Sequence, residues 1–173
     1  TVVNAYLGPV LDRYLSALSE RLRDFGYDGP MLITHSGGGV MSVEAAREIP
    51  ARICQSGPAA GVMAGANLGR ATDRPNVINL DVGGTSADVS LARGGRPLIR
   101  AEWNINFNIT INFPSVDVAT IGAGGGSIAR VDTGGVLKVG PESAGARPGP
   151  ACYRQGGEAP TVTDANLVLG RLG

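Results

Sequence analysis

Hydrophobic residues recur at helical spacing near the start of the chain and predict a helix over residues 8–25. They fall on one face of such a helix and comprise Val10, Leu11, Tyr14, Leu15, Leu18, Leu22 and Phe25. Pro9 suits the first turn, where its missing N–H is not needed, and Gly26 suits the end. Two shorter helices are expected over 42–48 and 56–69, and the expected N-cap of the second is Ser56.

Apolar runs predict a series of strands in the rest of the chain. They cover residues 31–34, 76–82, 86–92, 96–102 and 116–121, of which 76–82 reads as a buried strand. Gly94-Gly95 is the expected hairpin turn before 96–102. Residues 104–113 alternate polar and apolar at every position, which predicts one half-buried strand with a single apolar face. That face comprises Ile105, Phe107, Ile109, Ile111 and Phe113.

The last third predicts a hairpin, a long loop and a helix. The hairpin pairs 127–131 with 136–139, an ordered loop rich in glycine and proline follows over 140–160, and the helix covers 165–172. Helices therefore precede a mostly antiparallel group of strands, so the expected fold class is mixed α/β. No repeat and no internal domain boundary is visible.

Composition narrows the functional classes. The 173 residues suit one domain or part of a larger one, and the first residue is Thr, so we expect a piece of a longer protein. A formal net charge of zero argues against a nucleic-acid partner, and no apolar run suits a membrane helix. Cys54 and Cys152 are expected to be buried, reduced thiols of a cytoplasmic protein.

The strongest chemical signal follows the strand at 76–82. Asp81 is followed by Gly83, Gly84, Thr85 and Ser86, and the chain then re-enters a strand. Glycines let backbone N–H groups approach a phosphate, hydroxyls add donors, and the acid can hold Mg²⁺ or orient a water. No lysine follows the glycines and no helix begins there, so the segment is not a P-loop. A tight glycine-rich hairpin is the competing interpretation.

Other polar or glycine-rich positions are weaker signals. Gly122, Gly124, Gly125, Gly126 and Ser127 follow an apolar strand and form either a nucleotide-facing loop or a structural one. Residues 36–39 form a third glycine-rich stretch. His35 reads as structural, and Asp117 as either a polar site residue or a strand edge.

Several segments, taken in order, resemble the hydantoinase A/5-oxoprolinase family along nearly the whole chain. They are Asn4-Ala5-Tyr6 with Pro9, Ser36-Gly37-Gly38-Gly39-Val40, Ser56-Gly57-Pro58-Ala59-Ala60-Gly61, Asp81-Val82-Gly83-Gly84-Thr85-Ser86-Ala87-Asp88-Val89, residues 121–129, Gly140-Pro141 with Ser143-Ala144-Gly145, Pro148-Gly149-Pro150-Ala151-Cys152-Tyr153 and Thr161-Val162-Thr163-Asp164-Ala165-Asn166. His35 and Gly37 depart from the family pattern, and Ala87 stands where Thr is usual.

The resemblance implies an actin/hexokinase-like ATPase fold, with ATP between two ribonuclease-H-like lobes. Residues 1–70 would then be a helical bridge from the preceding lobe, and 71–173 would belong to the second lobe. Asp81 would be the catalytic and Mg²⁺-binding acid, residues 83–86 would hold phosphates, and Gly122–Ser127 would face phosphate or adenosine. The cofactors implied are ATP and Mg²⁺.

The same resemblance implies hydrolysis of a cyclic amide or imide with ATP cleavage, together with a B-type subunit. A subunit of an ATP-dependent ketone carboxylase is the alternative enzyme, and a non-catalytic nucleotide-binding module is the alternative outside catalysis. The 173 residues alone should be inactive, because one phosphate loop leaves the opposite side of the site missing. Self-association through the apolar helix would make a homo-oligomer.

Overall fold

The computed structural model describes residues 2–104 and 109–173 and divides into two compact units. Unit 1 comprises Thr1–Val77 and Leu91–Val118, and unit 2 comprises Ile78–Ser90 and Ala119–Gly173. Neither unit is continuous in sequence, which is why no boundary is visible in the composition of the chain. The predicted division near residue 70 concerns lobes of a larger protein and stays a prediction.

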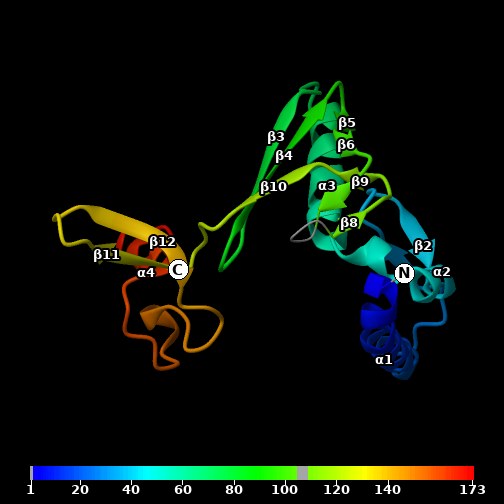
Figure 1. Ribbon diagram of the computed structural model, residues 1–173, viewed down its shortest axis with the longest axis horizontal. Coiled ribbons are helices and arrows are strands. Elements are labelled where there is room, and N and C mark those ends of the chain that lie inside the picture. Colours follow the sequence, from blue (N-terminus) through cyan, green and yellow to red (C-terminus); the bar gives the residue numbers. More distant parts are fainter. Residues whose placement is uncertain (1, 105–108) are drawn as a thin grey trace. The chain divides into compact units, whose positions relative to one another are not determined.

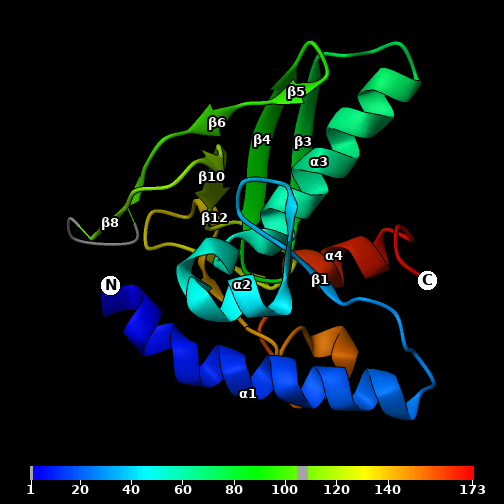
Figure 2. The same ribbon diagram turned by 90° about the vertical axis from the view of Figure 1, so that its right-hand side faces the viewer.

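Unit 1 contains the long helix and most of the helical residues. Its helices are α1 (Val2–Asp24), α2 (Val43–Glu48), the 3₁₀ helix η1 (Pro50–Ile53) and α3 (Ser56–Ala71). The main apolar cluster packs α1 against α2 through Leu11, Leu15, Val43 and Ala46, and Figure 2 shows the two helices side by side. Burying these side chains supplies the hydrophobic stabilisation that fixes α1 in place.

Two predictions about the first helix are wrong. The helix is already formed at Val2, so Pro9 lies inside it rather than in its first turn. Tyr14 is 62% exposed and Phe25 88% exposed, whereas Leu15 is 1% exposed. The face predicted from spacing was too wide, because a helix of 3.6 residues per turn separates Tyr14 from Leu15 by 100°.

The shorter helices follow the predicted pattern with small differences. Ser42 caps α2 by accepting a hydrogen bond from the N–H of Ala45. The α3 helix begins at Ser56, but its N-cap is Gln55, which makes no side-chain capping bond. Small residues on α3 permit close packing, with Ala59 and Val62 buried against Val116 and Val118.

Short antiparallel pairs make up the strands of unit 1. Strand β1 (Leu32–Thr34) pairs with β2 (Val40–Ser42), β6 (Ile99–Arg100) with β9 (Ser115–Val116), and β7 (Trp103–Asn104) with β8 (Thr110–Ile111). The predicted single strand over 104–113 is therefore wrong: Asn104 lies opposite Thr110, so the chain reverses. The expected apolar face is also divided, because Ile111 is buried and Ile109 is exposed; Ile105 and Phe107 lie outside the described residues. Alternation reports the period of extended backbone but not where it turns.

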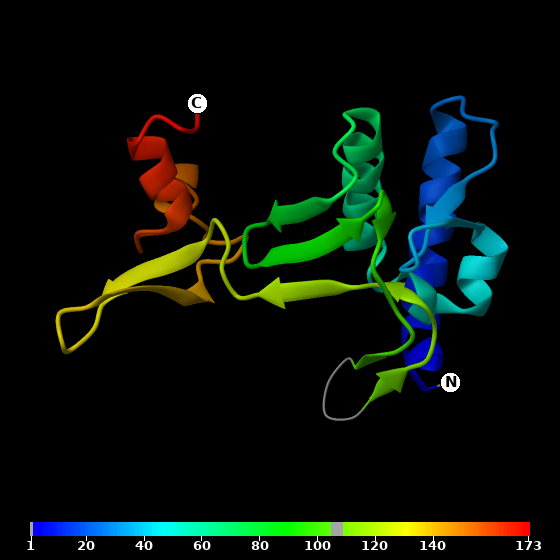
Figure 3. The ribbon, with the colours of Figure 1, turned by 90° about the horizontal axis from the view of Figure 1, so that it is seen from above.

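A four-stranded sheet contains the strand that leads into residues 81–86, called the acid–glycine loop from here on. Its order is β10-β4-β3, with β5 (Arg96–Pro97) paired to β4 (Ala87–Arg93) after the turn at Gly94-Gly95. Strands β3 (Val77–Val82) and β10 (Val118–Ile121) flank β4 (Figure 3). The predicted strand 96–102 is instead two short strands, β5 and β6, with different partners.

The strand β3 is not buried as predicted. Ile78 and Leu80 are 73% and 63% exposed, and Val82 is exposed as well. These three residues lie on one face of the strand, since alternate residues of a strand point the same way. A sequence pattern shows that one face of a strand is apolar, but it does not show whether other residues of this chain pack against that face.

Unit 2 contains most of β3 and β10, the first residues of β4, a long hairpin and a short helix (Figure 1). The hairpin joins β11 (Ser127–Val131) to β12 (Leu137–Ser143), as predicted, although β12 runs further. The 3₁₀ helix η2 (Ala151–Tyr153) and the helix α4 (Val162–Val168) follow. The last helix covers 162–168 rather than the predicted 165–172, and Thr161 is its N-cap.

The predicted mixed α/β class is confirmed, with helices beside several antiparallel strand pairs. In the described residues, none of the helices has the length and apolar character needed to cross a membrane.

Candidate functional site

The loop between β3 and β4 presents free backbone donors to its surroundings. The N–H of Gly83 donates to the carbonyl of Ser86 at 2.9 Å, which closes the turn. Within unit 2, the N–H groups of Gly84 and Thr85 make no such bond. A Cβ on Gly84 would meet nothing within 4 Å, so an anion can approach these N–H groups closely.

The glycine-rich segment after β10 lies directly against this loop. The N–H of Gly125 donates to the carbonyl of Gly83 at 2.9 Å, and that of Gly126 to the carbonyl of Gly84 at 2.6 Å. The two segments were predicted separately and stand about 40 residues apart in sequence. The structure brings them together: the carbonyls of Gly83 and Gly84 accept hydrogen bonds, whereas the N–H groups of Gly84 and Thr85 make none.

The closeness of the two segments explains why glycine occupies positions 124 to 126. A Cβ on Gly124 would lie 2.7 Å from the carbonyl oxygen of Gly83, and one on Gly126 would lie 2.9 Å from that of Gly84. A Cβ on Gly125 would lie 2.6 Å from Oγ1 of Thr163. Each approach is tighter than a side chain tolerates, so backbone packing alone accounts for these glycines.

The glycine-rich segment uses most of its own donors within the protein. The Ser127 hydroxyl is buried and accepts from the N–H of Gly124 at 2.9 Å. The Ser127 N–H in turn donates to the carbonyl of Gly124 at 3.1 Å. Gly122 and Ala123 are exposed at the edge of the segment. Nucleotide contact by Gly122–Ser127 stays a prediction; the geometry shows a support for the 83–86 loop.

The start of α4 anchors the glycine-rich segment on its other side. Both the N–H and the hydroxyl of Thr163 donate to the carbonyl of Gly125, each at 2.8 Å. The N–H of Ala144, just after β12, donates to the carbonyl of Gly126 at 2.8 Å. The acid–glycine loop is thus hydrogen-bonded to the glycine-rich segment, and that segment is hydrogen-bonded in turn to the start of α4.

Asp164 ties the loop around residue 152 to the same helix. It accepts from the N–H of Cys152 at 2.8 Å and from the N–H and hydroxyl of Thr161 at 2.9 and 2.7 Å. Burial raises the pKa of this carboxyl, but the bonds from Thr161 and Cys152 outweigh it and hold the pKa below its ordinary value. Asp164 therefore stays charged and holds the loop in place.

A cavity of about 370 Å³ lies beside the acid–glycine loop. Its lining residues come from the loop, the glycine-rich segment, the region after β12 and α4: Gly84, Thr85, Gly126, Gly145, Ala146, Pro150, Tyr153 and Thr163. Sequence reasoning missed the last five of these. The available signals were the dense glycine and proline of 140–160 and the family-like motifs that contain Pro150, Tyr153 and Thr163, and neither showed what these residues face.

Cys152 is adjacent to this cavity but is not an activated nucleophile. A hydrogen bond to Asp164, then burial and the negative charge of Asp164, raise the pKa of the Cys152 thiol. Both cysteines are free, as predicted, but neither is buried as predicted: Cys54 is exposed and Cys152 is partly exposed. The thiol therefore stays neutral, and the chemistry of the site rests on backbone donors, hydroxyls and Asp81.

Asp81 is the exposed acid at the end of β3. Across the described ranges, no group of three or more His, Cys, Asp or Glu side chains is arranged to hold a metal ion. A single carboxylate beside open phosphate donors suits Mg²⁺, which binds proteins through one or two carboxylates and otherwise keeps water and phosphate ligands. The neighbouring Asp88 instead accepts from the hydroxyl of Thr120 at 2.6 Å.

The remaining polar candidates lie in unit 1 and have structural partners. Ser36 is fully buried; its hydroxyl donates to the carbonyl of Arg52 at 2.7 Å and accepts from the N–H of Gln55 at 3.0 Å. Nδ1 of His35 accepts from the N–H of Gly37 at 3.0 Å. Asp117 forms a 3.7 Å ion pair with Arg100. These contacts favour the structural interpretation of all three residues.

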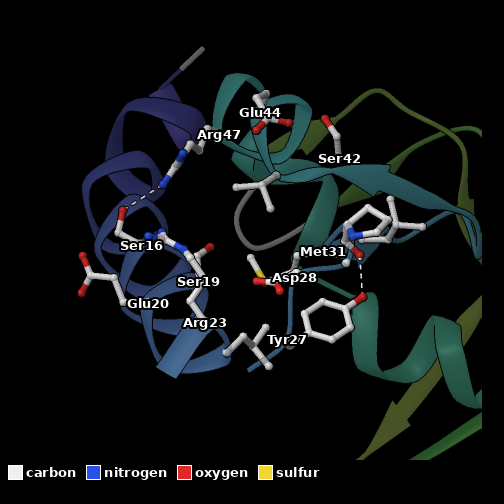
Figure 4. Close-up of a pocket in the computed structure, with 15 residues that line it drawn as sticks. Ser16, Ser19, Glu20, Arg23, Tyr27, Asp28, Met31, Ser42, Glu44 and Arg47 are labelled. Carbon is white, nitrogen blue, oxygen red and sulfur yellow. Dashed lines mark hydrogen bonds between the residues drawn. The ribbon is translucent and has the colours of Figure 1, made fainter. Parts of the chain in front are cut away.

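Unit 1 has a larger polar cavity of about 590 Å³ between α1, residues 27–32 and the start of α2. Figure 4 shows Arg47 bonded to Ser16 and the Tyr27 hydroxyl bonded to a backbone carbonyl. The guanidinium of Arg47 also pairs with Asp12 at 2.8 Å. The donors of Arg47 and Tyr27 are therefore engaged within the protein. The 83–86 loop differs in presenting backbone N–H groups, at Gly84 and Thr85, that make no hydrogen bond in the described residues.

Comparison with known proteins gives one consistent result. The Hydantoinase/oxoprolinase family matches residues 1–173. Caprolactamase subunit alpha of Pseudomonas jessenii is 45% identical over 99% of this chain and 25% of its own length. The 5-oxoprolinase of Saccharomyces cerevisiae is 40% identical over 99% of this chain and 13% of its own length.

Solved structures agree with this result. The crystal structure of the ATP-dependent caprolactamase from Pseudomonas jessenii matches with a TM-score of 0.76 and 44% identity, over 100% of this chain and 25% of that one. A nucleotide-free acetone carboxylase matches with a TM-score of 0.76 and 33% identity, over 92% and 22%. The chain thus spans about a quarter or less of the proteins that it matches.

Proposed function

Because the chain belongs to the Hydantoinase/oxoprolinase family, we propose that it supplies a phosphate-binding loop to an ATP-dependent enzyme that hydrolyses a cyclic amide or imide. The observation that carries this proposal is the loop between β3 and β4. Its N–H groups at Gly84 and Thr85 are open, its carbonyls are held by Gly125 and Gly126, and Asp81 stands beside it. Preorganised donors of this kind stabilise charge without having to rearrange.

The residues of the loop divide into binding and supporting roles. The N–H groups of Gly84 and Thr85 and the hydroxyls of Thr85 and Ser86 bind phosphate oxygens. Gly83 closes the turn through its bond to Ser86. Asp81 holds the hydration shell of Mg²⁺ or orients a water. Ala87 is buried at the start of β4 and adds no hydroxyl to the loop.

ATP would supply a phosphoryl group to the amide oxygen, which converts a poor leaving group into a good one. The chain contributes the positioning of phosphates in this reaction, and positioning is the main contribution of proteins to phosphoryl transfer. Residues on the opposite side of the nucleotide would come from the rest of the larger protein. The name of a related subunit, caprolactamase subunit alpha, also supports a multi-subunit enzyme, and a B-type subunit and a cytoplasmic location remain part of the proposal.

A ketone carboxylase subunit is the second candidate. Its support is the structural match to an acetone carboxylase. The caprolactamase match has higher identity and covers all of this chain, which favours the cyclic amide. Bicarbonate-dependent ATP turnover with a ketone, and none with cyclic amides, would select the carboxylase. A non-catalytic module is less favoured, because Asp81 and the loop donors are intact.

Substitution of Asp81 in the full-length protein with its partner subunit tests the proposal. The wild type should hydrolyse ATP in the presence of caprolactam, hydantoin or 5-oxoproline. Asp81→Asn keeps the shape of the side chain and removes its charge, so ATP turnover should fall at least a hundredfold, about 2.7 kcal/mol of transition-state stabilisation.

The matched control is Asp73→Asn, which makes the same change in an exposed turn of unit 1. Asp73 has a φ of 56°, a conformation that asparagine tolerates. Its turnover should equal that of the wild type. Unchanged turnover in Asp81→Asn would show that this acid has no part in the reaction.

A further inference from the structure

The lining of the cavity beside the acid–glycine loop comprises two kinds of group. The first is the pair of open N–H groups of Gly84 and Thr85. The second is the apolar surface of Gly145, Ala146, Pro150 and the ring of Tyr153. All of these residues belong to unit 2, so the cavity is built within one compact unit.

The part of the lining near Tyr153 is apolar and carries no charged side chain. Gly145 presents no Cβ, and Ala146 and Pro150 are small, so a planar group can lie close to the backbone. The Tyr153 ring is 53% exposed and supplies an aromatic face. Nucleic-acid bases stack on such faces with little dependence on their identity.

Hydrogen bonds hold the backbone that carries the apolar part of the lining, so this part is not a flexible loop. Ala144 is bonded to Gly126, and Cys152 is bonded to the Asp164 carboxylate. The Tyr153 ring packs on Gly149, where an added Cβ would lie 3.2 Å from the ring. A surface held in this way loses little entropy when a ligand binds.

We propose that this cavity receives the nucleoside part of the nucleotide, with the base against the Tyr153 ring and the phosphates directed to Gly84 and Thr85. The inference rests on the proposed function, since it assigns a further part of the same site. A volume of about 370 Å³ lies within the range of small-molecule sites and leaves the triphosphate to extend over the exposed 83–86 loop. Tyr153 is then a binding residue for the base and not for the phosphates.

The experiment compares two probes on the full-length protein with its partner subunit. Isothermal titration measures the affinity for a non-hydrolysable Mg·ATP analogue and for Mg·tripolyphosphate, which has no nucleoside. Tyr153→Ala should weaken the ATP analogue about tenfold or more, the loss expected for one base stack. Its affinity for tripolyphosphate should change less than twofold.

Two variants control for folding and for loop disturbance. Tyr153→Phe keeps the ring and should bind the ATP analogue as the wild type does. Gln155→Ala changes an exposed residue of the same loop and should leave both affinities unchanged.

Three outcomes would overturn the inference. Equal losses for both probes in Tyr153→Ala would mean that the ring only maintains the loop. Unchanged affinity for the ATP analogue in that variant would mean that the base lies elsewhere. A wild type that binds neither probe would reject the proposed function and this inference with it, which distinguishes that failure from a misplaced base.

Discussion

Gly124 is the residue at which backbone packing most directly controls the site. An added Cβ would lie 2.7 to 2.8 Å from the backbone of Gly83 and Gly84, atoms that cannot rotate away. We therefore expect Gly124→Ala to push the 83–86 loop outward, to destabilise the chain by about 1–3 kcal/mol and to weaken nucleotide binding. Thermal unfolding and titration with Mg·ATP measure the two effects.

Gly122→Ala is the matched control for that prediction. Its Cβ would lie 3.7 Å from Cβ of Pro141, an ordinary contact, so stability and binding should stay near those of the wild type. Equal effects at positions 122 and 124 would contradict the packing explanation.

Asp164 should make stability depend on pH in a defined direction. Its folded-state pKa is lowered, so its contribution is complete above the unfolded pKa of about 3.9 and is lost as pH falls through the folded pKa. Asp164→Asn lacks this contribution at every pH. The loss of free energy of unfolding should be about 2 kcal/mol at pH 7 and should shrink below about pH 4.

Urea unfolding of the 173-residue chain between pH 3 and 7 measures this difference. The exposed Glu158→Gln, in the same region, serves as control and should change stability little. A difference between wild type and Asp164→Asn that does not vary with pH would show that the charge of Asp164 is not the source.

At the scale of elements, α1 shows how the register of a helix decides which side chains stabilise. Leu15 is 1% exposed within the cluster that joins α1 to α2, and its neighbour Tyr14 is 62% exposed. Leu15→Ala should therefore destabilise the chain by about 2–5 kcal/mol. Tyr14→Ala should change stability by about 0.5 kcal/mol or less. Unfolding temperatures of the two variants test the observed register, and the reverse order would contradict it.

The exposed stripe of α1 is also the surface through which the chain is predicted to self-associate. Val2, Tyr6, Val10 and Tyr14 are all more than half exposed and recur every four residues. An exposed apolar stripe of this kind is a surface at which two protein molecules can associate and bury it from water. Homo-oligomer formation through it stays a prediction.

At the scale of the whole molecule, the described chain presents one phosphate loop and one cavity beside it. Phosphoryl transfer needs several groups to act on the same phosphates, and exposed donors in water contribute little each. We expect the 173 residues alone to bind Mg·ATP weakly, with a dissociation constant above about 100 μM, and to release almost no phosphate.

Isothermal titration and a phosphate-release assay on the 173-residue chain test this expectation, with the full-length protein as the positive control. Micromolar affinity together with measurable phosphate release would show that unit 2 alone contains a far more complete site.

The sequence by itself determined the elements and the family to which they belong. Helical spacing predicted α1, and capping or terminating residues predicted α2 and α3. Gly94-Gly95 predicted a hairpin turn, and Asp81 with Gly83, Gly84, Thr85 and Ser86 indicated a phosphate loop. These are local properties: the backbone conformation of a few neighbouring residues follows from their own side chains. The order of the motifs then sufficed to identify the family.

Only the tertiary structure decided which of these parts meet. Nothing local indicates that Gly125 and Gly126 bond to the carbonyls of Gly83 and Gly84, or that Tyr153 lies by the same loop. The chain reversal within 104–113 and the exposed face of β3 were also hidden. Hydrogen bonds and burial between distant segments depend on which backbone groups are brought into reach, and alternation or spacing along one segment does not carry that information.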